Sequence, residues 1–337
     1  TDDNLSLCKA TQKKLLQYFQ TTTRNDLFFK EIDEQFYNSF VAYLQSEKFY
    51  INTIGKHIRV LKTMLNNAPK DLQSLSKHKD FYVFDEDNQN IYLTEEELTK
   101  LWDCDLSSQP HLEKVRDWFV ILAWTGCRYS DLPKVIKVNK KATNISYKQQ
   151  KTGTNVVIAI HHMVRSVLEK YDYKIPSPIS NQKFNEEIKI AAELAGLNEE
   201  IEIEKNIGGV ITQFTYKKYE VICSHTGRRS FCTNAYKQKV PTYNIMKASG
   251  HKTERSFLKY IKMSEEEHAE QMAIVWDNLY NKEKTNSSIS EQELKDENEK
   301  LKEKIKTIKM VNSALIRVNA EQKNQIDELR SQLYERL

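Results

Sequence analysis

The spacing of the apolar residues constrains this fold more than any other feature, because it is helical along most of the chain and strand-like in one stretch only. Between residues 28 and 65 apolar side chains recur every three or four positions, as on the buried face of a helix. Between residues 135 and 160 they alternate, on both sides of a Lys-Thr-Gly-Thr sequence (151–154) that is typical of a hairpin turn. Helical spacing returns from about residue 163 to the end. The sequence therefore predicts a mainly α fold with one small antiparallel β-sheet.

The chain has 337 residues, enough for two domains and an extension. A polar, acidic stretch after the first helices is the best candidate for a linker. Just beyond it, Thr94-Glu95-Glu96-Glu97 has the form of a capping box and predicts the start of a helix. The predicted parts are a helical domain (1–84), a linker (85–92), a mixed α/β domain (93–284) and a coiled-coil tail (285–337).

The tail has a sustained heptad pattern, which is typical of a coiled coil. Its d positions are Leu294, Leu301, Ile308, Leu315, Gln322 and Leu329, and its a positions are Asn298, Ile305, Asn312, Asn319, Ile326 and Leu333. The alternative is a single solvated helix, but the apolar residues at a and d argue against it. Asn at several a positions favours a parallel dimer at a cost in stability. We therefore expect one helix roughly 70 Å long that forms a weak, parallel zipper.

Positive charge is concentrated locally, although the formal net charge is only +4. Residues 132–168 contain no Asp or Glu, and residues 221–262 contain a single acid, Glu254. Each stretch alone fits an ordinary Lys-rich surface. The two together, interleaved with His and Tyr, indicate contact with a polyanion such as nucleic acid.

The five Cys lie far apart, without a CxxC pair or a zinc-ligand spacing. This usage favours a reducing compartment, and we expect no metal site. No apolar run is long enough to span a membrane, and no signal peptide is visible. The sequence therefore predicts a cytoplasmic protein without membrane contact. It begins with Thr1 rather than Met, which leaves room for a further N-terminal segment.

Metal-free phosphoryl transfer on DNA requires a nucleophile, fixed cations around the phosphate oxygens and an acid for the leaving hydroxyl. Six residues have these chemical types: Arg128, Lys151, His225, Arg228, His251 and Tyr260. Arg suits the oxygens because its planar guanidinium binds two of them and stays charged. Each residue alone has an ordinary structural explanation, so the inference rests on all six together.

Some of these positions have competitors. Lys148 is the nearest alternative to Lys151. Tyr236 and Tyr243 compete with Tyr260, but both come before His251 at spacings typical of helix packing. We interpret these two tyrosines as core residues.

The order and spacing of the six residues resemble the tyrosine recombinase (phage integrase-like) family. That family has a TG-x-R-x-S-E/D-L segment, a Lys in a β-hairpin, an H-x-x-R, a G-H and, nine residues later, a Tyr. The matching residues here are Thr125-Gly126-Cys127-Arg128-Tyr129-Ser130-Asp131-Leu132, Lys151, His225 to Arg228, Gly250-His251 and Tyr260. The resemblance covers about residues 92–280. It departs in Cys127, where a larger aliphatic residue is common, and in Asp131, which replaces the commoner Glu.

The resemblance implies a fold and a set of roles. The helical domain would be a core-binding (SAM-like) domain, and the mixed α/β domain would be the catalytic domain. Tyr260 would form a 3′-phosphotyrosyl link, Arg128 and Arg228 would neutralise the phosphate, and Lys151 would protonate the 5′ oxygen. His225 would act as acid or base, and His251 would hydrogen-bond the phosphate. Asp131 would hold the Arg128 guanidinium, and no cofactor would be required.

The resemblance also implies partners. They are double-stranded DNA recombination sites and further copies of the chain, as a tetramer on DNA. The heptad pattern adds parallel contacts between the tails. The protein would be an integrase of a bacterial mobile element, associated with the nucleoid. Basic residues expected to contact DNA are Lys56, Arg59, Lys62, Lys134, Lys148, Arg229 and Lys252. Alternatives are a type IB-like topoisomerase, a non-catalytic DNA-binding relative and a coiled-coil scaffold.

Overall fold

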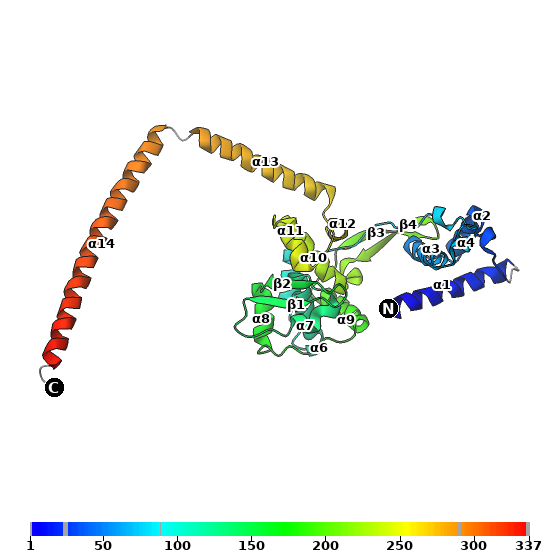
Figure 1. Ribbon diagram of the computed structural model, residues 1–337, viewed down its shortest axis with the longest axis horizontal. Coiled ribbons are helices and arrows are strands. Elements are labelled where there is room, and N and C mark those ends of the chain that lie inside the picture. Colours follow the sequence, from blue (N-terminus) through cyan, green and yellow to red (C-terminus); the bar gives the residue numbers. More distant parts are fainter. Residues whose placement is uncertain (1, 23–25, 88, 289–290, 335–337) are drawn as a thin grey trace. The chain divides into compact units, whose positions relative to one another are not determined.

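The computed structural model describes residues 2–22, 26–87, 89–288 and 291–334. The chain divides into two compact units, Thr1–Met263 and Ser264–Leu337. The first unit contains the predicted helical domain and the predicted mixed α/β domain up to Met263, and the second contains two long helices (Figure 1). In the described part of the chain, no helix is both long and apolar enough to cross a membrane.

Four helices form the N-terminal part: α1 (Asp2–Thr21), α2 (Glu34–Ser46), α3 (Ile51–Asn66) and α4 (Lys70–Gln73). The apolar faces of α1, α2 and α3 pack into a separate core that includes Phe36, Phe40 and Ile54. The apolar run begins at residue 28, but the helix that contains most of its first half, α2, begins only at Glu34. Asp33 caps α2, because its carboxylate accepts a hydrogen bond of 2.9 Å from the Phe36 amide.

The second part is built around α6 (Pro110–Thr125), which is buried along nearly its whole length. It contacts α5 (Glu95–Asp103), α8 (His162–Lys170), α9 (Asn181–Leu194) and α10 (Ser224–Lys237). The predicted capping box is confirmed, because Thr94 and Glu97 cap the start of α5 reciprocally. Three short helices complete this part: α7 (Leu132–Val135), α11 (Thr242–Ser249) and α12 (Glu254–Leu258).

The predicted hairpin is confirmed as β1 (Asn144–Lys148) paired with β2 (Asn155–Ala159), in antiparallel register. A second hairpin, β3 (Glu200–Ile207) and β4 (Val210–Lys217), lies where the sequence analysis expects helices, so that expectation is wrong. Glu and Ile alternate at the start of β3, which is a strand period. Gly208 and Gly209 supply the left-handed turn, with φ values of 62° and 84°. The hairpin tip is bridged to Tyr50, at the start of α3.

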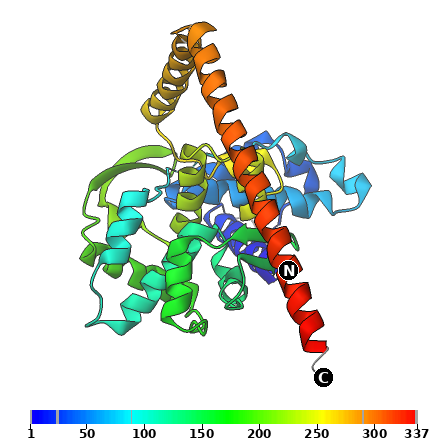
Figure 2. The same ribbon diagram turned by 90° about the vertical axis from the view of Figure 1, so that its left-hand side faces the viewer.

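The second unit consists of α13 (Glu265–Ser288) and α14 (Glu291–Tyr334). Figures 1 and 2 show α14 as one uninterrupted rod. Its 44 residues correspond to about 66 Å. Apolar side chains of the predicted seam are about half exposed, namely Leu301, Ile305, Ile308 and Leu315. The side chains of four further seam positions lie outside the described residues, namely Leu294, Ile326, Leu329 and Leu333.

Candidate active site

The first element of the site is the end of α6. Gly126 ends this helix in a left-handed conformation (φ 62°), and a Cβ there would lie 2.3 Å from the Phe231 ring on α10. Glycine therefore allows both the turn and the close approach of α6 to α10. Arg128 follows two residues later and is half-buried.

Arg228 lies at the centre of the site and is fully buried. Its Nη1 donates to the carbonyl oxygens of Gly126 (2.6 Å) and Ser249 (2.7 Å). Its Nη2 donates to Nε2 of His251 (2.9 Å). One guanidinium thus joins the end of α6, the end of α11 and the Gly-His turn, through charge-assisted hydrogen bonds.

His251 is held as a neutral imidazole. Arginine can only donate, so Nε2 of His251 must accept, which assigns the ring proton to Nδ1. Nδ1 faces Oγ of Ser249 at 2.8 Å, a suitable acceptor. Burial, followed by the charges of Arg228 and Arg128, lowers the pKa of His251 to about 3.

Tyr260 lies against these groups. Its ring centroid is 4.7 Å from the His251 ring and 5.2 Å from the Arg228 guanidinium carbon. The short helix α12 anchors it from one side through the buried Phe257. On the other side Thr233 of α10 donates to the Tyr260 carbonyl oxygen at 3.1 Å. The predicted nucleophile, His251 and Arg228 are therefore brought together.

The β1–β2 hairpin adds its tip to the same place. Arg128 Nη1 donates to Oε1 of Gln149 at 2.7 Å. Asp131 does not hold Arg128 as expected, because its Oδ1 accepts the amide of Gln150 at 2.7 Å instead. Arg128 and Asp131 thus both bind the residues that lead into Lys151, which is exposed at the tip.

His225, in the first turn of α10, is linked to the cluster by charge. Its side chain is exposed to solvent, yet its pKa is lowered, and the largest cause is partial burial by the surrounding atoms. The positive charges of Arg229, Arg228, Arg128 and Lys151 lower it further. Of the two hairpin lysines, it is Lys151 and not Lys148 whose charge lowers the pKa of His225.

The predicted DNA-contact residues divide into two groups. Lys56, Arg59, Lys134, Lys148 and Lys252 are exposed. Arg229 is only 9% exposed and donates to the Ile91 carbonyl oxygen at 2.7 Å, so in the free protein its side chain is engaged within the fold. Lys62 is likewise engaged with two backbone carbonyl oxygens, at 2.8 and 2.7 Å.

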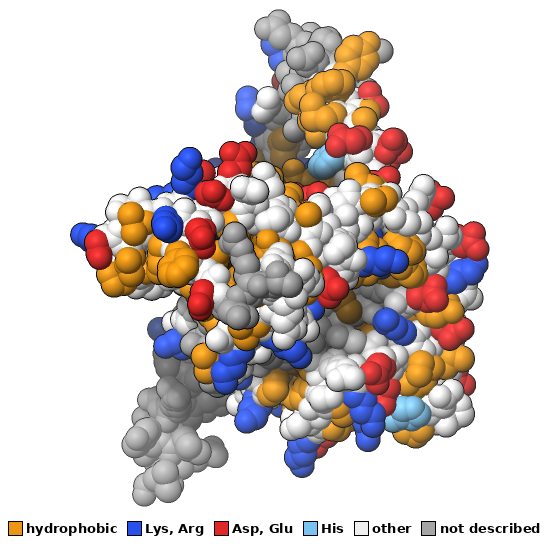
Figure 3. Space-filling view, turned by 90° about the vertical axis from the view of Figure 1, so that its right-hand side faces the viewer, with side chains coloured by type: hydrophobic (Ala, Val, Ile, Leu, Met, Phe, Trp, Pro, Cys, Tyr) orange, Lys and Arg blue, Asp and Glu red, His pale blue; other side chains and the backbone are white. Residues whose placement is uncertain are grey.

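The surface around the N-terminal helices is electrostatically mixed. These helices lie at the right-hand side of Figure 1. Figure 3 looks onto that side and shows acidic and basic side chains interspersed among apolar ones. Among the residues that the structure describes, the side chains visible from this side carry both signs of charge.

Two residues of the site carry no signal in the sequence, and a third lies elsewhere than its spacing predicts. Gln149 and Ser249 lie between the two arginines, although no motif marks them. Tyr243 was interpreted as a core residue, but its side chain is 66% exposed, so that interpretation is wrong. It helps line a cleft of about 300 Å³ beside His251, together with Thr154, Met246, Lys247, Gly250 and Lys252.

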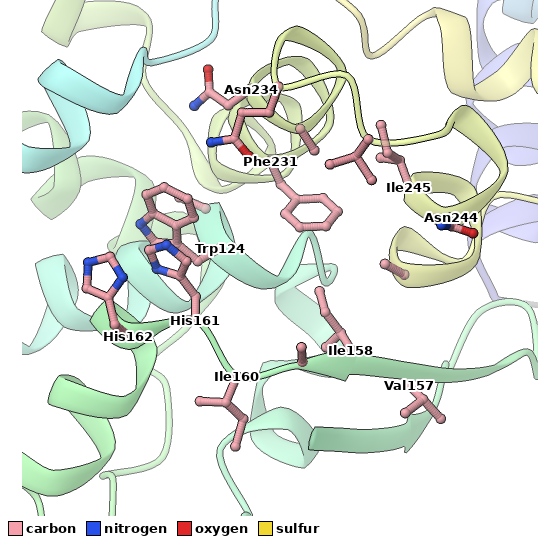
Figure 4. A pocket seen from close by; sticks show the side chains of 16 residues that line it. Trp124, Val157, Ile158, Ile160, His161, His162, Phe231, Asn234, Asn244 and Ile245 are labelled. Carbon is pink, nitrogen blue, oxygen red and sulfur yellow. The ribbon is translucent and has the colours of Figure 1, made fainter. Parts of the chain in front are cut away.

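A larger, apolar pocket of about 550 Å³ lies between β2, α10 and α11 (Figure 4). Trp124 and His161 stack at its edge, with ring centroids 3.6 Å apart. Burial lowers the pKa of His161 to about 4. None of the six predicted catalytic residues lines this pocket.

Residues 1–82 match the family model of the phage integrase SAM-like domain. No curated protein matches the chain. Solved structures with the same fold include the XerH site-specific recombinase bound to palindromic difH substrate, which is 16% identical, with a TM-score of 0.54 over 78% of this chain and 77% of that one.

Two integrases also share the fold. The Tn1549 transposon integrase in complex with transposon right end DNA is 14% identical, with a TM-score of 0.54 over 78% of this chain and 91% of that one. A lambda integrase dimer bound to a COC′ core site is 16% identical, with a TM-score of 0.51 over 75% of this chain and 89% of that one. Residues 1–82 thus carry a phage integrase SAM-like domain, and the chain shares its fold with these recombinase and integrase structures.

Proposed function

We propose that this protein is a site-specific DNA recombinase that cuts and rejoins DNA through a covalent bond between Tyr260 and a 3′ phosphate. The observation that carries the proposal is the contact between three chemically matched groups. Arg228, His251 and Tyr260 lie within one cluster, and Arg128 reaches it through Gln149. The XerH structure holds a palindromic difH substrate and the Tn1549 integrase structure holds transposon right end DNA, which supports a DNA substrate for this chain.

In the proposed reaction the Tyr260 hydroxyl oxygen attacks the phosphorus atom as it gives up its proton, and the bond from phosphorus to the 5′ oxygen breaks. Arg128 and Arg228 stabilise the charge that builds up on the non-bridging oxygens. Lys151 transfers a proton to the leaving 5′ oxygen, and His225 accepts or returns protons near the nucleophile. The phosphotyrosyl bond conserves the energy of the broken bond, so rejoining reverses the same steps.

The free site requires rearrangement before it can bind a phosphate. Arg228 is fully buried, and the rings of Tyr260 and His251 lie against its guanidinium. Its Nη2 is occupied by His251, so a phosphate oxygen must displace this ring or reach the guanidinium past it. We infer that DNA binding moves Tyr260 and frees one face of Arg228.

The tail would bring protomers together. Leu301, Ile308 and Leu315 are each more than half exposed on the isolated α14, so pairing would remove apolar surface from water. In a parallel dimer of the predicted register, Glu297 at g faces Lys302 at e of the partner helix, an attractive pair. We propose parallel tail contacts within a tetramer that forms on DNA.

The test is a covalent capture experiment. A library of nicked duplexes is incubated with the full chain in the presence of EDTA. Because of the nick, cleavage releases a short strand that diffuses away, and the protein stays attached to the DNA. We expect an adduct that survives SDS with the wild type and none with Tyr260→Phe, which should bind DNA equally well. Equal adduct with Tyr260→Phe would contradict the proposal, and no adduct with the wild type would favour a non-catalytic DNA-binding protein.

A second assay separates recombination from topoisomerase activity. Supercoiled plasmid with and without two copies of a captured site is incubated with the protein. A recombinase exchanges strands between the two copies, whereas a type IB-like topoisomerase relaxes both plasmids as a monomer.

A further inference from the structure

We infer that Gln149 is a positioning residue that aligns Arg128 and Arg228 on the same phosphate. This inference rests on the proposed function, and it assigns a role to a residue outside the six predicted catalytic positions. Gln149 lies at the end of β1 and is only 1% exposed. A buried carboxamide must satisfy both its acceptor and its donor within the protein.

The Gln149 side chain connects the two arginines. Its Oε1 accepts from Arg128 Nη1 at 2.7 Å, and its Nε2 donates to the Ser249 carbonyl oxygen at 2.9 Å. The same carbonyl oxygen accepts from Arg228 Nη1 at 2.7 Å. Each guanidinium is therefore held through its Nη1, and the distance between the two is set by one side chain and one carbonyl group.

The same side chain also controls the hairpin tip. Thr152 Oγ1 donates to Gln149 Oε1 at 2.7 Å, and the Gly153 amide donates to the Gln149 carbonyl oxygen at 3.0 Å. Lys151 lies between these contacts, so its backbone follows the position of Gln149. The residue thus links three of the proposed catalytic groups.

Only a carboxamide of this length fits the contacts. Glutamate would keep the acceptor toward Arg128 but would place an anionic oxygen 2.9 Å from the Ser249 carbonyl oxygen, where the amide now donates. Methionine would have a similar shape and neither polar group. Gly250 is built around the same side chain, because a Cβ there would lie 2.2 Å from Gln149 Nε2.

The alignment of the two arginines should affect the reaction through the negative charge on the phosphate. A phosphate gains negative charge on its non-bridging oxygens in the transition state, and the aligned arginines stabilise it. A methylphosphonate at the scissile position has lost one charged oxygen, so it requires less of this stabilisation. A residue that aligns the arginines should therefore matter on phosphate and matter much less on methylphosphonate.

The experiment measures single-turnover cleavage by the full chain on captured DNA that carries either a phosphate or a methylphosphonate. We expect Gln149→Met to lower the rate about 10- to 100-fold on phosphate, as misplacement of a catalytic group does, with unchanged DNA affinity. On methylphosphonate the loss should shrink to about 3-fold or less, on the same reasoning. The matched control is Gln150→Met, whose exposed side chain lies one residue further on.

Equal losses on both substrates would overturn the inference and would indicate a merely structural role. A wild type that forms no adduct refutes the proposed function instead, and a second measurement then decides on Gln149. Amide hydrogen exchange of the free chain should be faster in Gln149→Met at Gly153 and His251, and unchanged in Gln150→Met. Unchanged exchange in Gln149→Met would overturn the inference without any DNA.

Discussion

Replacing Gly250 by alanine should destabilise the chain far more than the same change at another left-handed glycine. Gly250 has φ 71° and no room for a Cβ, which would lie 2.2 Å from Nε2 and 2.5 Å from Cδ of Gln149. Gly196 has φ 77° and nothing within 4 Å of a built Cβ. The two substitutions share the backbone strain and differ only in the clash.

The expected magnitudes follow from these two terms. Alanine in a left-handed conformation costs about 1–2 kcal/mol, which is the whole effect expected for Gly196→Ala. Gly250→Ala also displaces the Gln149 carboxamide, with its contacts to Arg128, Ser249 and Thr152. Three hydrogen bonds at about 1 kcal/mol each bring the expected total for Gly250→Ala to about 4–5 kcal/mol.

Urea unfolding followed by tryptophan fluorescence measures the difference, since Trp102, Trp118 and Trp124 all belong to or pack against the core around α6. The midpoint should fall at constant slope in both variants, and about three times further for Gly250→Ala, as the two free energies require. Equal shifts would refute the close packing of Gln149 against the turn at Gly250.

Three further outcomes are expected. His251 is neutral in the fold with a pKa of about 3, through burial and the charge of Arg228, whereas its unfolded value is about 6.5. The wild type should therefore lose folding stability as the pH falls below 6.5. Between pH 7 and pH 5 this loss should exceed that of His251→Gln by about 1 kcal/mol, a figure reduced for the partial exposure of His251. Parallel curves of stability against pH for the two proteins would contradict this. DNA affinity should fall linearly with salt on a double-logarithmic plot, because phosphate contacts release counterions; a flat plot in filter binding would argue against phosphate contacts. Glutamate at Leu301, Ile308 and Leu315 together should abolish self-association in sedimentation experiments, while glutamate at three exposed polar positions of α14 should not; unchanged association would exclude the tail as the contact.

Much of the fold follows from local signals in the sequence. The capping box at Thr94 and the hairpin around Lys151 depend on neighbouring residues only, and both are found. The second hairpin is not predicted, although Glu and Ile alternate at its start, because the segment lies between predicted helices. The helical spacing of apolar residues on either side of the segment masks this strand period.

The missed parts of the site depend on contacts between distant segments. Gln149 and Ser249 are 100 positions apart, and neither has a spacing that marks the pair. Asp131 was expected to bind the nearest cation in sequence, yet the hairpin places the Gln150 amide against it instead. The exposure of Tyr243 likewise depends on how α11 packs, which its helical spacing alone does not determine.

The central claim concerns one tyrosine out of seventeen, so the most direct measurement identifies the residue that is joined to DNA. The captured adduct is digested with protease and nuclease, and the nucleotide-bearing peptide is sequenced by mass spectrometry. The proposed mechanism predicts a nucleotide joined through its 3′ phosphate to Tyr260. Within the described residues, Tyr260 is the only tyrosine whose ring contacts both His251 and Arg228. A nucleotide on the exposed Tyr243, or on any other residue, would contradict it.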